Sequence, residues 1–386
     1  SKVELVFSSS ESEAVKIALV NLRRDLIRTL DCSVTAGGII RILVGTVGNL
    51  PELDEKADIS KLRAEDGTYR KEAFLIQEKD GELLIAGTDR RGTIYGIYDF
   101  CEWLGVSPWY FFADVPVRRR SEAVIENGYC KVDYPSVEYR GIFINDEEEL
   151  EHWVWRYMGE TTIGVKTYEK IFELLLRLKL NYIWPAMHVN SFNLKQENGA
   201  LANRMGIVVG TSHCDMLMRS NNREWKPWLA KKGYTDVEYD FSIPGRNREI
   251  LKEYWRESVE QNRDFEVSYT VGMRGIHDSG FETKSLEGLT GEKLLKAKIE
   301  LLESVMAAQQ EILSETLDTE PMKTFVPYKE VLELYDNGLK VPEDLTLIWT
   351  NDNYGYVRRY PGEKEKARKS GNGIYYHNSY WAPPGA

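Results

Sequence analysis

Residues 138–147, EYRGIFINDE, mark a change of pattern in this sequence of 386 residues. An apolar segment, 139–144, stops there at three polar residues, and short apolar segments then alternate with amphipathic ones to the end of the chain. The amphipathic segments 168–179, 246–262 and 292–314 are long enough to be helices on the outside of a barrel. This alternation is typical of a parallel sheet built from βα units.

Seven apolar segments of this region have the length and composition of buried strands. They are 139–144, 182–185, 207–210, 266–272, 324–327, 345–349 and 373–376. A closed barrel of this type has eight strands, and the chain stops soon after the seventh. We therefore predict an α/β protein in which residues 138–386 form a (β/α)8 TIM-type barrel with seven strands visible, truncated at its C-terminus.

The region before this barrel has a different pattern. A short strand, 3–7, is followed by a helix that starts at the capping-box pair Ser10 and Glu13 and carries an apolar stripe to residue 30. Strands are predicted at 39–44, 73–79 and 82–88, the last two joined by the hairpin turn at 80–81, and a second helix at 91–104. We expect a small α+β sandwich domain over 1–117 and a linker over 118–137.

Composition excludes several classes of protein. The formal net charge is −11 and the one basic run, 118–120, is short, whereas sequence-independent binding of nucleic acid needs clustered Lys and Arg. No apolar stretch reaches the length of about 18 residues that a membrane span requires. The four cysteines lie far apart and lack metal-site spacing, so we interpret them as unpaired thiols.

Polar side chains gather directly after the predicted strands, where the loops of a barrel converge on one mouth. In chain order they are Asn145, Asp146, Glu147, His188, His213, Asp215, Arg274, His277, Asp278, Tyr328, Glu330, Asn351, Asp352, Asn353, His377 and Tyr380. Taken singly, a polar residue after a strand is more often a cap or turn residue than a ligand. Four of the five histidines belong to this set, however, and only His152, which we place in a loop, does not. The combination indicates one functional site.

The residue types in this set suit the cleavage of a glycosidic bond. Several carboxyl groups on different strands allow one to stay protonated by burial while another stays ionised. Arg274 offers a fixed positive fork for a substrate carboxylate, and an ion pair with Asp278 on the same loop is the alternative role for it. The tyrosines and asparagines can hydrogen-bond sugar hydroxyls.

A metal site is a competing interpretation of the same region. His188, His213 and Asp215 are of zinc-ligand type and lie near one another in the sequence. No HxH or HExxH spacing is present, and no phosphate-binding glycine loop follows any predicted strand. We therefore expect neither a metal nor a cofactor.

Several longer motifs resemble glycoside hydrolase family 115, the xylan α-1,2-glucuronidases. In the first domain these are TDRRGTIYGIY at 88–98, GVSPWY at 105–110 and ADVPV at 113–117. In the barrel region they are RGIFINDE at 140–147, NYIWPAM at 181–187, GTSHC at 210–214, GMRGIHD at 272–278, PYKEV at 327–331, NDNYG at 351–355 and YYH at 375–377. The resemblance covers essentially the whole chain.

The resemblance implies that glucuronic acid, or its 4-O-methyl derivative, is removed from glucuronoxylan or aldouronic-acid oligosaccharides with inversion at the anomeric carbon. It implies a pocket built from Asn145, Asp146, His213, Arg274, Asp278, Tyr328, Glu330, Asn351, Asn353, His377 and Tyr380. At Asn351 the family pattern leads us to expect Asp, which puts a catalytic role there in doubt. Homodimerisation would run through C-terminal domains missing from this chain, and an extracellular or periplasmic location is favoured if polymeric xylan is the substrate.

Our mechanistic hypothesis makes Glu330 and Asp278 the acid/base pair, with Asp146 as the main alternative. An inverting site holds its two carboxyl groups roughly 6.5 to 9.5 Å apart to admit a water. Arg274 would hold the uronate, and His213, Tyr328, Asn351, Asn353, His377 and Tyr380 would bind the sugar together with Asn145. Two alternatives stay open: a non-catalytic sugar-binding protein on a truncated barrel, and a hexosaminidase-like glycosidase.

Overall fold

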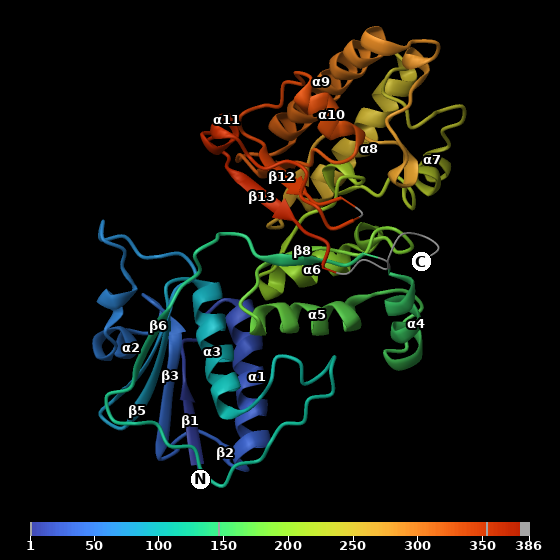
Figure 1. Cartoon of the computed structure of the whole chain (residues 1–386). Helices are drawn as coiled ribbons and strands as arrows, with labels where there is room; N and C mark the ends of the chain where they lie inside the picture. The colour runs from blue at the N-terminus through green and yellow to red at the C-terminus, as the bar shows by residue number, and fades with distance from the viewer. Residues whose placement is uncertain (1, 146, 353, 379–386) are drawn as a thin grey trace. The chain divides into compact units, whose positions relative to one another are not determined.

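The structure of this chain is a computed structural model that describes residues 2–145, 147–352 and 354–378 (Figure 1). The chain forms two compact units. Unit 1 consists of Ser1–Gly141, Val165–Tyr182 and Leu201–Ile207, and unit 2 of Ile142–Gly164, Ile183–Ala200 and Val208–Ala386. The chain thus passes between the units more than once, and the division into 1–117, 118–137 and 138–386 stays a prediction.

Unit 1 contains a six-stranded sheet in the order β2-β1-β3-β5-β4-β6. Its strands are β1 Lys2–Val6, β2 Ser33–Val34, β3 Ile40–Thr46, β4 Phe74–Lys79, β5 Glu82–Gly87 and β6 Cys130–Asp133. The strands β2, β1, β3 and β5 run parallel, whereas β4 pairs antiparallel with both β5 and β6. The predicted hairpin between β4 and β5 is confirmed: Asp80 and Gly81 both have positive φ, 55° and 80°, as a two-residue hairpin turn requires.

The two faces of this sheet are covered by different helices (Figure 1). Helices α1, Glu13–Leu30, and α3, Arg90–Leu104, pack against each other, and α3 lies on the face that carries Phe74 and Ile85. Helix α2, Pro51–Lys56, and the short helix η1, Ile59–Leu62, close the other face over a buried apolar cluster. Alternate residues of one strand point to opposite faces, so the continuous apolar runs of β3, β4 and β5 follow from burial on both sides.

The start of α3 explains the first family motif. The side chain of Asp89 accepts a hydrogen bond from the Gly92 amide at 2.9 Å and so caps the helix. A Cβ atom at Gly92 would overlap the carbonyl of Ala73, and one at Gly96 would approach the Ile85 side chain to 2.8 Å. The two glycines therefore allow α3 to lie directly on the sheet.

The start of α1 corrects one prediction. Ser12 caps this helix, because its side chain accepts a hydrogen bond from the Val15 amide at 3.3 Å. The hydroxyl of Ser10 instead bonds that of Ser8, at 2.7 Å. The capping-box assignment to Ser10 was wrong by two residues. Several serines precede the helix, and the sequence pattern alone does not show which of them caps it.

Helix α5, Val165–Arg177, brings a buried ion network into unit 1. The Arg177 guanidinium, 1% exposed, bonds Asp25 at 2.6 Å and Glu173 at 2.9 Å. The Asp25 and Glu173 side chains are 0% and 4% exposed, and Arg24 contacts both of them at 3.1 and 2.8 Å. Four charges of balanced sign are therefore enclosed together, which is the condition under which buried charges are tolerated.

Unit 2 contains the seven strands that the sequence predicted, in two groups of hydrogen-bonded strands. One group has the order β7-β8-β9 and the other β10-β11-β12-β13, whose neighbours are parallel. The strands are β7 Gly141–Phe143, β8 Tyr182–Trp184, β9 Val208–Val209, β10 Ser268–Thr270, β11 Met322–Phe325, β12 Thr346–Thr350 and β13 Asn372–Tyr375. A parallel bridge between Val209 and Val267 links the groups. The α/β class is confirmed, and the described residues form no closed sheet.

The helices that follow these strands include two long ones, α8 and α9, which pack on each other (Figure 1). The helices are α4 Glu148–Tyr157, α6 Gln196–Met205, α7 Trp225–Lys232, α8 Arg246–Asn262, α9 Gly291–Thr316, α10 Glu330–Asp336 and α11 Glu363–Lys366. His152 lies within α4, so its placement in a loop was wrong. Among the described residues no helix has the length and apolar character of a membrane span, and all four cysteines are free thiols, as predicted.

Candidate active site

Five of the predicted site residues come together in unit 2. The loop after β9 carries His213, the loop after β10 carries Arg274 and Asp278, and the segment after β11 carries Tyr328 in the loop and Glu330 at the start of α10. The His213 and Tyr328 rings lie edge to face, with their centroids 4.6 Å apart. Residues separated by more than one hundred positions thus share one cluster, because parallel strands deliver their following loops to the same edge.

Arg274 is the centre of this cluster. Its Nε and Nη2 atoms donate to the two carboxylate oxygens of Glu330 at 3.0 and 2.8 Å, in a bidentate pair. Its Nη1 atom also forms an ion pair with Asp278, the alternative that the sequence left open. The Arg274 side chain is only 2% exposed, so this guanidinium is fixed between the two candidate acid/base residues.

Asp278 receives three further restraints on its position. Lys329 Nζ donates to Asp278 Oδ2 at 2.7 Å, and His213 Nε2 lies 3.0 Å from Asp278 Oδ1. The backbone also holds it, because His277 and Asp278 both lie in the left-handed region, with φ of 57° and 59°. Two cationic side chains, Arg274 and Lys329, therefore flank this carboxylate.

His213 is held neutral by its surroundings. Burial, aided by the charges of Arg274 and Lys329, lowers the pKa of His213 to about 3. Its Nδ1 atom is buried without a hydrogen-bond partner among the described residues.

We expect the neutral state of His213 to make stability depend on pH. In the unfolded chain histidine titrates near 6.5, and the pKa of folded His213 is about 3. The unfolded state therefore binds more protons between these values, and stability falls as the pH drops through this window. From pH 7 to pH 5 the group contributes a loss of about 2 kcal/mol.

Urea unfolding of the parent protein and of His213→Gln at pH 7 and pH 5 measures this contribution. The variant should lose less stability between the two values than the parent does. Equal losses in both proteins would show that His213 is protonated in the folded state.

His213, Cys214 and Asp278 also resemble a ligand set for a metal ion, since one potential ligand atom of each lies within 4.8 Å of the others. The electrostatics oppose this reading. Arg274 and Lys329 already occupy the Asp278 carboxylate, and burial, followed by the charge of Asp215, raises the pKa of Cys214 to about 12. A cation would enter beside two positive groups and a thiol that resists deprotonation.

A second cluster lies at the ends of β12 and β13. Asn351 Oδ1 accepts hydrogen bonds from the His377 amide at 3.0 Å and faces His377 Nδ1 at 2.8 Å. The hydroxyl of Tyr375 lies 2.7 Å from His377 Nε2. The Tyr375 ring also packs edge to face on Phe143 of β7 and Trp184 of β8. The first and last strands of unit 2 thus meet through aromatic side chains.

The remaining predicted site residues divide into two groups. Asn145 is described and exposed, two residues after the end of β7. Asp146, Asn353 and Tyr380 lie outside the described residues, so the roles predicted for them stay predictions. Their neighbours Asn351 and His377 form the second cluster, and Asp352 contributes electrostatically to the surroundings of Tyr328.

Sequence reasoning missed two residues that shape these loops, Lys329 and Asn221, and it named Glu147 without giving it a structural role. Lys329 was passed over inside the motif at 327–331 although it contacts Asp278. Glu147 is 1% exposed, and its carboxylate accepts hydrogen bonds from three consecutive amides, those of His188, Val189 and Asn190, at 2.6, 3.1 and 2.9 Å. Asn221 binds two of the site loops. Position after a strand selected Glu147 and was a usable signal for Lys329, but not for Asn221.

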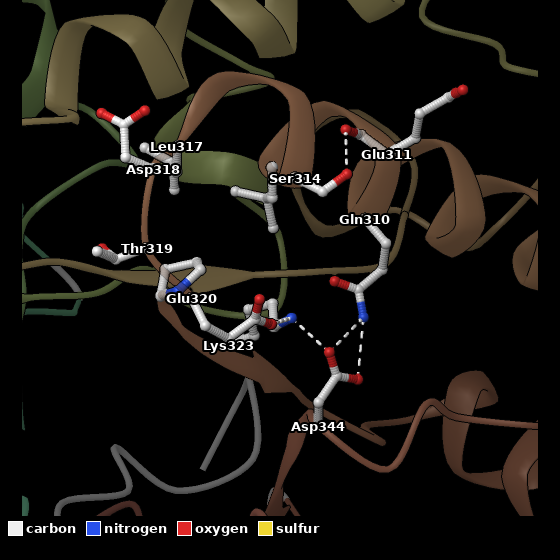
Figure 2. Close-up of a pocket in the computed structure, with 11 residues that line it drawn as sticks. Gln310, Glu311, Ser314, Leu317, Asp318, Thr319, Glu320, Lys323 and Asp344 are labelled. Atoms are coloured by element: carbon white, nitrogen blue, oxygen red, sulfur yellow. Dashed lines mark hydrogen bonds and ion pairs between the residues drawn. The ribbon is translucent and has the colours of Figure 1, made fainter.

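A pocket of about 440 Å³ in unit 2 lies at the opposite ends of the strands. Its lining residues come from the end of α9, the start of β11 and the segment before β12 (Figure 2). Figure 2 shows Gln310 and Lys323 reaching Asp344, and the Lys323 side chain is 4% exposed and paired with Glu320 and Asp344. Gln310, Glu320, Lys323 and Asp344 bond one another here, and this end of the strands is typically the stabilising end rather than the functional end.

Comparison with known proteins agrees with this geometry. The sequence profile of glycosyl hydrolase family 115 matches residues 132–386. The structure of BtGH115A, a family GH115 4-O-methyl-α-glucuronidase with specificity for decorated arabinogalactans, superposes with a TM-score of 0.87 at 37% identity. The match covers 99% of this chain and 49% of that protein, so the chain spans about half the length of this relative. No curated protein matches the sequence.

More distant structures share the fold alone. A Streptomyces plicatus N-acetyl-β-hexosaminidase has a TM-score of 0.51 at 14% identity, covering 96% of this chain and 69% of its own. An enzyme of family GH138 that targets pectin rhamnogalacturonan II has a TM-score of 0.50 at 14% identity, covering 91% of this chain and 48% of its own.

Proposed function

Because this chain belongs to glycosyl hydrolase family 115, we propose that it removes α-linked glucuronic acid or 4-O-methyl-glucuronic acid side chains from a plant polysaccharide by an inverting mechanism. The observation that carries the proposal is the buried Arg274, which touches both Asp278 and Glu330. A guanidinium is suited to a sugar carboxylate, and two carboxyl groups are what inversion needs.

In the proposed reaction, one carboxyl group protonates the oxygen that leaves with the main chain, while the other accepts a proton from the attacking water. In the proposed roles Glu330, which forms the bidentate contact with Arg274, is the acid. Asp278 is the base, and the contact with Lys329 Nζ at 2.7 Å would hold its carboxylate in place.

We further propose that the seven strands of unit 2 belong to a (β/α)8 barrel. The strand order follows the chain in both groups, the Val209–Val267 bridge joins the groups, and Phe143 of β7 contacts Tyr375 of β13. In a barrel of this fold the loops after the strands form the active site, which fits the position of the Arg274 cluster.

Two polysaccharides are candidate substrates. Glucuronoxylan is the substrate that the family motifs imply, and a decorated arabinogalactan is the second candidate, because BtGH115A is 37% identical and specific for such chains. Incubating the full-length protein with each polymer and separating the released acids by chromatography tests the proposal. Release of either uronic acid supports it, and the configuration of the first-formed anomer, observed by proton NMR, tests inversion.

Sugar binding without release of a uronic acid would instead support the non-catalytic alternative. Cleavage of N-acetylated sugars would support the hexosaminidase-like alternative, for which Arg274 has no evident ligand.

We expect Arg274→Lys to raise the KM for a uronate substrate by about tenfold to a hundredfold, because lysine lacks the bidentate fork and a charged hydrogen bond contributes roughly 1.5–3 kcal/mol. Initial rates on an aldouronic-acid oligosaccharide measure the effect. Calorimetric binding of glucose, which has no carboxylate, is the control and should change little. An unchanged KM would remove Arg274 from substrate binding.

A further inference from the structure

The segment 220–223, which follows the short helix η3, Met216–Met218, binds three of the loops that surround the Arg274 cluster. Ser220 Oγ donates to the Met187 carbonyl at 3.2 Å, and Asn222 Nδ2 and Arg223 Nε both donate to the His188 carbonyl, at 3.2 and 2.9 Å. These contacts hold the loop after β8. Only Asn221 reaches the loops after β9 and β10.

Both polar atoms of the Asn221 side-chain amide form hydrogen bonds. Its Nδ2 donates to the carbonyls of Cys214 and Gly275, both at 3.1 Å, and its Oδ1 accepts from the His277 amide at 3.1 Å. The residue is 2% exposed, so water does not compete for these bonds. One side chain therefore joins the loop of His213 to the loop of Arg274 and Asp278.

The loop that Asn221 holds has an unfavourable backbone. His277 has φ of 57° and ψ of 51°, and Asp278 has φ of 59°. Residues other than glycine keep the left-handed conformation only where the surroundings impose it. The His277 amide that Asn221 accepts belongs to the first of these two residues, so the bond acts at the point where the chain turns Asp278 toward Arg274, Lys329 and His213.

We propose that Asn221 is a positioning residue that fixes the backbone of residues 275–278 and thereby places the Asp278 carboxylate. This inference deepens the proposed function and rests on it for its effect on catalysis. Asn221 contacts no reacting atom, so its loss should disturb the step that uses Asp278 rather than the binding of the sugar.

The test compares Asn221→Ala with Asn222→Ala in the full-length protein. Asn222 is the matched control because it is the adjacent residue with the same side chain, yet it binds only the His188 carbonyl. Asn221→Ala should lower kcat by about tenfold to a hundredfold, as a displaced catalytic group does, leave KM within about twofold, and shift the pH limb of the rate that depends on Asp278. Asn222→Ala should stay close to the parent.

Hydrogen exchange separates this inference from the proposed function. Amides of 275–278 should exchange faster in Asn221→Ala than in Asn222→Ala, whatever the substrate is. A parent protein that releases no uronic acid would overturn the proposed function alone, while the exchange contrast still tests the restraint. If the parent is active and Asn221→Ala leaves both hydrogen exchange and kcat unchanged, the inference is wrong. It is also wrong if Asn221→Ala lowers kcat only in proportion to the fraction of folded protein and leaves the pH profile unaltered.

Discussion

Glu330→Gln and Asp278→Asn are each expected to lower the kcat for release of glucuronic acid by about two to four orders of magnitude, which is the range for a lost general acid or base. Both substitutions keep the shape of the side chain and remove its ability to exchange a proton. Arg274 contacts both residues, so each variant should keep part of its hydrogen bonding and remain folded. Rates on a glucuronoxylan oligosaccharide measure the effect.

A second substrate assigns the two roles. An aryl glucuronide has a leaving group that needs no protonation, so the variant that lacks the acid should recover much of its activity on it, whereas the variant that lacks the base should not. Glu333→Gln is the control, because Glu333 is exposed in the first turn of the same helix α10. Near-normal turnover in both Glu330→Gln and Asp278→Asn would discard the assignment.

Arg177→Met is expected to lower the free energy of unfolding by about 3–5 kcal/mol, the range for removing one partner of a buried ion pair. The variant leaves Asp25 and Glu173, which are 0% and 4% exposed, with Arg24 as a shared partner, and Glu173 also keeps its contacts with Lys170 and the Tyr110 hydroxyl. Arg24→Met should cost less, because the Arg24 side chain is 26% exposed. Urea unfolding measures both, and a loss of under about 1 kcal/mol in Arg177→Met would mean that the remaining partners compensate the two carboxylates.

The same network predicts that the stability of the protein falls at acidic pH. Burial alone would raise the pKa of Glu173, but the charges of Arg177 and Arg24 outweigh it and lower this pKa to about 2. An unfolded glutamate titrates near 4.3, so the contribution of Glu173 is complete above that pH and is lost as the pH falls toward 2. The loss should be smaller in Arg177→Met.

The fold was largely predictable because its signals are local. The hairpin at Asp80 and Gly81, the stripe of α1 and the short strands of unit 2 each depend on neighbouring residues, and all were found near their predicted positions. The membership of α5 in unit 1 was not predicted. An amphipathic pattern shows that a helix buries one face, but it does not show which element that face packs against. The ion pair of Glu173 and Arg177, four residues apart on that face, could have suggested a charged partner.

The sequence predicted which residues belong to the candidate site, but it did not predict the contacts among them. Residues after strands identified His213, Arg274, Asp278 and Glu330, which the structure joins. The pairing of Arg274 with Glu330, 56 positions away, depends on tertiary structure alone. Asn221 lies in a loop whose apolar residues show no regular spacing, and it does not directly follow a predicted strand. No rule applied to the sequence could therefore have selected it.

The buried Lys323 and its two acidic partners have a consequence for how this protein can change. They fasten the beginnings of β11 and β12, whereas the groups proposed for chemistry follow the ends of the strands. Robustness and selectivity are therefore encoded at separate places along the same strands. Loops at one extremity are free to diverge toward new glycans while the other extremity keeps the scaffold intact.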